Sequence, residues 1–138
     1  RWSVAEVLEH LGAAEGLLFS LAQGTLATPE DAEWRSVVAA TSMAQLFQRI
    51  TDRSQKFQAP EPLRPRGGKS RAELLAQFAG AREVTLDFVR TTDAPLKSHL
   101  GDSPGGKMSG YQFLAFIAAH NMRHNLQIAE ALAQLAVK

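Results

Sequence analysis

Apolar residues recur every three or four positions along most of the chain, which is the spacing of amphipathic helices. The first such segment begins after Ser3, and Glu6 lies three residues further on, so the two side chains form a predicted capping box. Gly24 is a plausible end for this helix. Its predicted core face consists of Val4, Val7, Leu8, Leu11, Leu18 and Ala22.

The second segment is predicted to open at Thr28 as the N-cap, with Pro29 at the first helical position and two acidic residues in the first turn. The short run at residues 39–42 is a weak helix former, so we expect the segment to break into two pieces there. Its large apolar residues are Trp34, Val37, Val38, Met43, Leu46, Phe47, Ile50 and Phe57.

Two further helices follow, each with a capping box at its start. Residues 58–69 contain three prolines and two glycines and are predicted to be a connector. Ser70 and Glu73 open the third helix, and Ser109 and Gln112 open the fourth, after a Pro- and Gly-containing loop at residues 91–107. No segment shows the alternation of a strand. The pattern predicts an all-α four-helix bundle, and a single domain over residues 1–138.

Two histidines interrupt the apolar stripe of the last predicted helix. His120 and His124 are four residues apart, so their Cβ atoms lie about 6 Å apart on one helix face. Neutral imidazole is a common metal ligand, and burial favours the neutral form. The alternative is that both rings, and His10 on the first helix, are core residues with ordinary hydrogen bonds. The stripe consists of Phe113, Ile117, His120, His124, Ile128, Leu132 and Leu135.

The composition excludes several classes of function. The chain has 138 residues and a net charge of +1, so it lacks the basic excess of a nucleic-acid-binding protein. It has no cysteine, which leaves His, Asp and Glu as metal ligands. The apolar stretches are too short and too interrupted to span a membrane. The sequence begins at Arg1 without a methionine, shows no signal peptide, and is expected to be cytoplasmic.

The ordered motifs resemble the DinB/YfiT-like family of metalloenzymes, whose domain is a four-helix bundle with a three-histidine metal site. The matching pieces are Trp2-Ser3 through Glu9-His10-Leu11 with Glu15, and the run from Tyr111-Gln112-Phe113 to Ala119-His120-Asn121-Met122-Arg123-His124-Asn125-Leu126-Gln127-Ile128. Ala59-Pro60-Glu61, Phe78 and Arg82 are similar to the middle of one branch of the family. The likeness covers nearly the whole chain.

The resemblance implies one divalent metal ion held by His10, His120 and His124, with its remaining positions open to water or substrate. An all-nitrogen ligand set suits Zn²⁺ or Ni²⁺ first, and Fe²⁺, Co²⁺ or Mn²⁺ are alternatives. Family members usually have a helix before the Trp-Ser motif, and this sequence starts at that motif. That helix is missing from this chain, or residues 28–57 cover the same groove, or a partner chain does. We therefore expect a homodimer.

Two classes of function follow from the resemblance. In the first, the protein is an enzyme in which the metal activates a low-molecular-weight thiol or a water against a small electrophilic substrate, as in a thiol-dependent transferase or a hydrolase. In the second, it is a non-catalytic, stress-associated metal-binding or oligomerisation module. A metal-free bundle is the third alternative. An H-E-x-x-H metalloprotease is excluded, because Asn121 stands where the glutamate would be.

Two residues are candidates for a role next to the metal ligands. Gln127 follows His124 by three residues and can orient that ring or position a substrate. Arg82 lies on the apolar stripe of the third helix, where it either binds an anionic substrate group or pairs with a bundle carboxylate such as Glu15. Glu6 can orient His10, although its place in the capping box is the simpler explanation.

Overall fold

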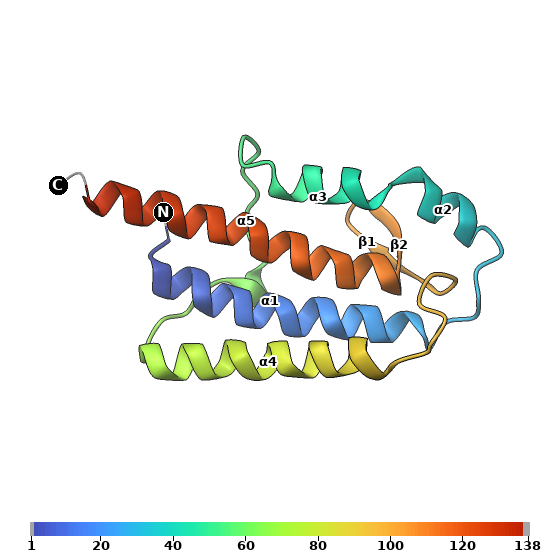
Figure 1. Ribbon diagram of the computed structural model, residues 1–138, viewed down its shortest axis with the longest axis horizontal. Helices are drawn as coiled ribbons and strands as arrows, with labels where there is room; N and C mark the ends of the chain where they lie inside the picture. Colours follow the sequence, from blue (N-terminus) through green and yellow to red (C-terminus); the bar gives the residue numbers. More distant parts are fainter. Residues whose placement is uncertain (1, 137–138) are drawn as a thin grey trace.

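Three long helices lie side by side, and two short helices follow one of them along its outer side (Figure 1). The computed structural model describes residues 2–136. The helix α1 lies between α5 and α4 and packs against both. The elements are α1 (Val4–Thr25), α2 (Trp34–Ala40), α3 (Met43–Thr51), the 3₁₀ helix η1 (Glu61–Leu63), α4 (Arg71–Thr91), β1 (Leu100–Ser103), β2 (Gly106–Ser109) and α5 (Gly110–Ala136).

The predicted capping boxes set where three of the helices begin. At α1 the Glu6 carboxylate accepts from the Ser3 amide at 2.7 Å, while the Ser3 hydroxyl accepts from the Glu6 amide at 3.3 Å. The Ser70–Glu73 and Ser109–Gln112 pairs form the same reciprocal bonds before α4 and α5. These bonds use amide groups that a helix otherwise leaves without partners, so the short local motif fixes the first turn.

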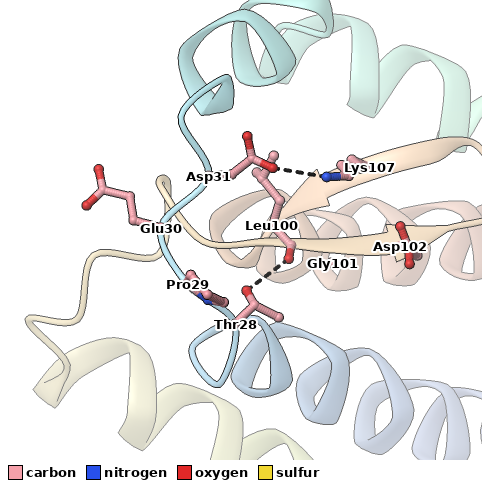
Figure 2. A pocket seen from close by; sticks show the side chains of 8 residues that line it. All are labelled: Thr28, Pro29, Glu30, Asp31, Leu100, Gly101, Asp102 and Lys107. Carbon is pink, nitrogen blue, oxygen red and sulfur yellow. Dashed lines mark hydrogen bonds and ion pairs between the residues drawn. The ribbon is translucent and has the colours of Figure 1, made fainter.

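The second predicted segment breaks in two, as expected. A new capping box between Ser42 and Gln45 starts α3 directly after α2 ends at Ala40. The predicted start at Thr28 is wrong, because α2 begins at Trp34. The Thr28 hydroxyl instead donates to the carbonyls of Thr25 and Leu100, at 2.6 and 3.2 Å, so it closes the turn after α1 (Figure 2).

A β-hairpin begins inside the loop predicted at residues 91–107 and ends at Ser109, so the expectation of an entirely α-helical chain is corrected. β1 and β2 pair antiparallel with Leu100 opposite Ser109 and Ser103 opposite Gly106. Gly106 has a φ of +111°, a conformation that side-chain-bearing residues rarely adopt. Two four-residue strands are too short to show an alternating pattern, and they hold each other by backbone bonds. The protein is mostly helical with a small two-stranded sheet.

The hairpin is tied to the segment after α1 around a shallow pocket of about 440 Å³ (Figure 2). There Lys107 Nζ on β2 lies 3.0 Å from a carboxylate oxygen of Asp31. The next residue after the hairpin, Gly110, begins α5 against α1. A Cβ atom at Gly110 would meet the Thr25 hydroxyl oxygen at 2.6 Å, so the close approach of the two helices requires glycine.

The apolar stripe of α5 is buried only along its first part. Phe113 and Ile117 are buried, and Leu46 and Ile50 of α3 pack around Ala119 beside them. Leu132 and Leu135, at the far end of the predicted stripe, are 53% and 68% exposed. Within residues 2–136, no helix combines the length and the apolar character that crossing a bilayer requires.

Candidate metal centre

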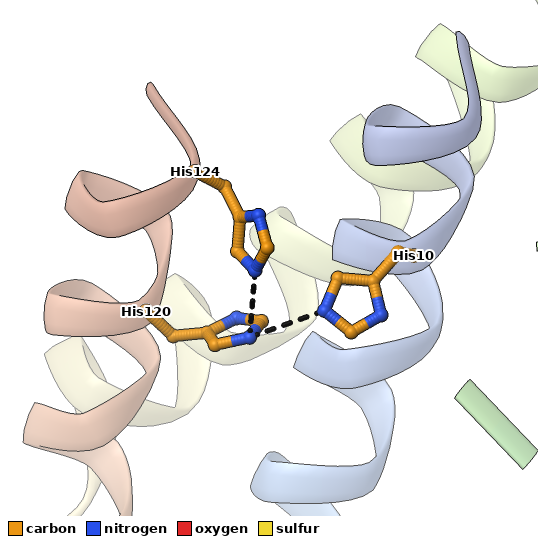
Figure 3. A group of neighbouring side chains, drawn as sticks. All are labelled: His10, His120 and His124. Carbon is orange, nitrogen blue, oxygen red and sulfur yellow. Dashed lines mark hydrogen bonds between the residues drawn. The ribbon is translucent and has the colours of Figure 1, made fainter. Parts of the chain in front are cut away.

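Three histidine rings converge between α1 and α5 (Figure 3). The Nε2 atom of His120 lies 3.2 Å from Nε2 of His10 and 3.1 Å from Nε2 of His124. Because α5 presents residues four apart on one face, His120 and His124 point at the same spot. α1 runs antiparallel to α5 and supplies the third ring from the opposite side. The predicted convergence of the three rings is confirmed, with one ligand atom from each within 4.8 Å of the others.

The outward-facing nitrogens of two rings are held by acceptors that carry no proton. His10 Nδ1 lies 2.9 Å from the Leu63 carbonyl oxygen, and His124 Nδ1 lies 2.8 Å from Oε1 of Gln127. Each Nδ1 must therefore donate its hydrogen, which leaves the Nε2 lone pair of a neutral ring facing the centre. Gln127 orients His124 as the sequence suggested, whereas Glu6 caps α1 and Leu63 orients His10.

The three inner nitrogens fit a metal better than they fit one another. A neutral His120 carries at most one hydrogen on Nε2, yet both neighbouring Nε2 atoms are acceptors. A cation at the centre would accept all three lone pairs. Two ligands about 2.0–2.1 Å from a tetrahedral zinc ion lie about 3.3 Å apart, which is close to the 3.2 and 3.1 Å that separate His120 Nε2 from the other two nitrogens. The third pair, from His10 and His124, lies within 4.8 Å. The donor set and its spacing therefore suit a divalent metal of borderline softness.

Burial keeps the rings neutral. Desolvation, followed by repulsion from the other two histidines, lowers the pKa of His120 to about 3. Desolvation and His10 lower the pKa of His124 to about 4, and burial also lowers the pKa of His10. The remaining charged groups that act on His120 and His124 are the guanidinium groups of Arg123 and Arg53, with no carboxylate among them. At neutral pH the cluster is an uncharged set of lone pairs ready to bind a cation.

Aromatic side chains and a pocket border the cluster. The Trp2 ring lies 4.9 Å from the His10 ring between centroids, and Phe116 stacks on His120 at 6.1 Å. His10 and His124 are only 4% and 7% exposed, whereas His120 is partly exposed. A pocket of about 510 Å³ lies beside Trp2. Its lining residues are Trp2, Phe57, Gln58, Ala59, Arg64 and Pro65.

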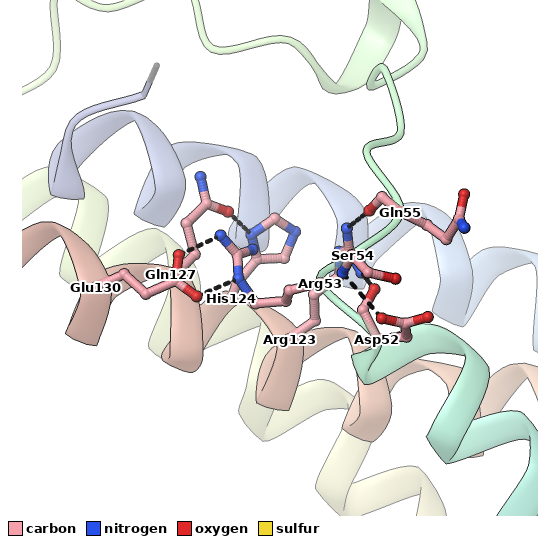
Figure 4. A network of polar contacts seen from close by, with 8 residues as sticks. All are labelled: Asp52, Arg53, Ser54, Gln55, Arg123, His124, Gln127 and Glu130. Carbon is pink, nitrogen blue, oxygen red and sulfur yellow. Dashed lines mark hydrogen bonds and ion pairs between the residues drawn. The ribbon is translucent and has the colours of Figure 1, made fainter.

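Arg123, directly before His124, holds the neighbouring loop on α5 (Figure 4). Its guanidinium group donates to three backbone carbonyls in the last turn of α3 and the loop after it, those of Ile50 at 3.0 Å, Asp52, and Gln55 at 2.6 Å. Carbonyls at a helix C-terminus otherwise lack partners. A bidentate ion pair between Arg53 and Glu130 adds a second tie, at 2.8 and 2.7 Å. The Arg123 contacts could not be predicted from the sequence because their acceptors are backbone atoms, which every residue type supplies.

Arg82 is not brought to the histidine cluster. It lies on α4, on the other side of α1, and its guanidinium group binds both carboxylate oxygens of Glu15 at 2.7 and 2.8 Å. This is the second of the two roles considered for it. Asn121 donates to the Ile117 carbonyl at 2.9 Å within its own helix, so it supplies no base. Of the two candidates, Gln127 is the one that contacts a predicted ligand.

A helical fold with three neutral histidines converging between two long helices defines a candidate metal-binding domain. The family model of the DinB superfamily matches residues 1–128. The chain therefore belongs to the DinB superfamily, as the motifs in its first and last helices indicated. No curated protein and no solved structure matched this sequence.

Proposed function

We propose that this protein is a divalent-metal-dependent enzyme with His10, His120 and His124 as its ligands. The observation that carries the proposal is the convergence of three Nε2 lone pairs, two of them fixed by outer hydrogen bonds. Three neutral nitrogen ligands leave a fourth position for an exchangeable molecule, which is the layout of catalytic rather than structural zinc sites. Zn²⁺ and Ni²⁺ are the metals we expect first, with Fe²⁺, Co²⁺ and Mn²⁺ as alternatives.

The proposed reaction is a transferase or hydrolase reaction in which a low-molecular-weight thiol or a water attacks a small electrophile. The metal would supply Lewis acidity, which lowers the pKa of a water or a thiol and polarises a carbonyl. The chain's own residues do the rest. Leu63 and Gln127 hold two of the rings in one tautomer, and Phe116 packs on the third, His120, which is partly exposed.

The second candidate is a non-catalytic metal-binding or stress-associated module. The burial of His10 under Trp2 favours it, because a sealed ion cannot exchange its fourth ligand. Partial exposure of His120 supports the enzyme.

The proposal also covers the domain extent, the oligomeric state and the cellular location of the protein. We take the chain as one DinB-like domain over residues 1–138, with α2 and α3 together as the fourth helix of the bundle. Apolar side chains on the outer faces of α1 and α5 support a homodimer, because such surface is costly to leave in water. They are Leu17, Leu21, Met122 and Leu126. We expect a cytoplasmic protein that acts on a small molecule.

Metal content tests the proposal. Untagged protein, as purified and after reconstitution with zinc or nickel, should hold about one ion per chain, measured by plasma mass spectrometry. The H120A/H124A variant should hold none. H99A is the matched control, because His99 binds the Thr28 carbonyl outside the cluster, and it should keep the full content. Absence of metal in reconstituted wild-type protein would contradict the proposal and leave three hydrogen-bonded core histidines.

A further inference from the structure

The pocket beside Trp2 is attached to the histidine cluster at two points. One wall is Trp2, whose ring contacts the His10 ring at 4.9 Å between centroids. The lining also includes Arg64, which directly follows Leu63, the residue whose carbonyl accepts from His10 Nδ1. A molecule in this pocket would therefore lie next to a predicted metal ligand. At about 510 Å³ the pocket is in the range of small-molecule sites, about 300–1,000 Å³.

The walls combine aromatic surface with a cationic group. Phe57 is 71% exposed, and one face of its ring lies 5.3 Å from the Arg123 guanidinium carbon. An exposed phenylalanine beside a tryptophan is apolar surface that a flat ligand would remove from water. Arg64 uses Nε for the Ala59 carbonyl and Nη1 for Glu61, at 3.2 and 2.8 Å. Among the described residues nothing accepts from its Nη2, so this nitrogen is available to a ligand.

The charges around the pocket favour an anion. The ion pair between Arg64 and Glu61 joins two largely exposed side chains, so a ligand carboxylate can compete for it at little cost. Three neutral histidines would leave the charge of a divalent metal uncompensated. The charged side chains that act on His120 and His124, besides the histidines themselves, are those of Arg123 and Arg53. An anion in the pocket is therefore attracted by Arg64 and by the loaded metal site, whereas a cation is repelled by both.

We propose that this pocket binds a planar organic anion, an aromatic or conjugated carboxylate, with its carboxylate on Arg64 and its flat body against Trp2 and Phe57. Attraction of the anion by the metal ion rests on the proposed function. Its binding to Arg64 and to the aromatic rings does not depend on a metal. The proposal names the ligand class of a pocket that adjoins the candidate metal centre.

Benzoate is the probe, and its neutral analogue benzamide is the control ligand. The chain has two tryptophans, so the W34F background leaves Trp2 as the sole fluorescent reporter in the pocket. Each ligand is titrated into this protein with and without one equivalent of zinc, and zinc content is measured in the same samples. The variant R64Q is compared with R66Q, which changes an exposed arginine of the same connector that does not line the pocket.

Benzoate should change Trp2 fluorescence with saturation. R64Q should weaken its binding about tenfold, the loss of one charged hydrogen-bonding partner, and R66Q should leave it within twofold. Zinc should tighten benzoate binding by about fivefold, a modest coupling between neighbouring sites, and should not affect benzamide. Failure of benzoate to bind zinc-loaded protein, or equal effects of R64Q and R66Q, would overturn the pocket proposal and leave the metal proposal intact. Absence of zinc binding, with benzoate binding still sensitive to R64Q, would overturn only the proposed function.

Discussion

Replacing Gln127 with leucine should weaken metal binding without unfolding the protein. The Gln127 side-chain oxygen accepts from His124 Nδ1 at 2.8 Å and so fixes which ring nitrogen faces the cluster. Leucine fills similar space but accepts nothing, which leaves a half-buried N–H without a partner and allows the ring to turn. Loss of such an outer partner costs about 10- to 100-fold in metal affinity, or about 1.4–2.7 kcal/mol.

The assay is a competition titration of zinc between the protein and a chromophoric chelator at pH 7. Q127E is the informative second variant, because a carboxylate at the same position accepts the same hydrogen bond and adds negative charge. We expect it to bind zinc at least as tightly as the wild type. N125L is the matched control, since it makes the same amide-to-leucine change at an exposed position of α5.

Two results would refute this reasoning. Zinc affinity of Q127L within twofold of the wild type would mean that the Gln127 bond does not hold the ring for a metal. An equal loss in N125L would mean that the effect comes from an added leucine on α5 rather than from His124. Circular dichroism of all three variants checks that each remains folded.

Three further predictions concern stability. R82M should lower the free energy of unfolding in urea by about 3 kcal/mol, because it leaves the buried Glu15 carboxylate unpaired. Its zinc affinity should stay unchanged. A loss of stability under 1 kcal/mol would contradict the importance of the ion pair. Because the folded pKa values of His120 and His124, about 3 and about 4, lie below the ordinary value of 6.5, the unfolded chain takes up protons first on acidification. Zinc-free protein should therefore be fully stabilised above about pH 6.5 and lose about 2–4 kcal/mol by pH 5, and a flat urea midpoint over this range would contradict the burial of neutral rings. G110A should lower the thermal midpoint by several degrees, because its methyl group would collide with α1; an unchanged midpoint would show that α5 can shift.

Local patterns in the sequence were enough to predict where three of the helices begin and that His120 and His124 face the same way. A capping box is complete within four residues, so the starts of α1, α4 and α5 could be predicted from Ser and Glu or Gln at fixed spacing. The convergence of His120 and His124 follows from the helical repeat in the same way. The family resemblance added His10 as the third ligand, and the structure brings its ring to the same point.

Features that depend on contacts between distant segments could not be predicted in this way. The hydrogen bond from His10 to Leu63 joins residues 53 positions apart and uses a backbone carbonyl, which any residue type supplies. The Thr28 hydroxyl, predicted to cap α2, instead donates to the Leu100 carbonyl of the hairpin, a partner 72 positions away. From the sequence, Arg82 could bind either a substrate anion or a carboxylate of the bundle. The packing of α4 against α1 places it on Glu15.

X-ray absorption spectroscopy of the zinc-loaded protein tests the central claim most directly, because it reports the atoms bound to the metal. Three imidazole nitrogens and one nonprotein oxygen ligand at about 2.0–2.1 Å are the predicted result, with bound zinc and its imidazole scattering lost in H120A/H124A. A zinc environment of carboxylate oxygens and water, or imidazole scattering that persists in the double variant, would contradict the assignment of His10, His120 and His124 as the metal site.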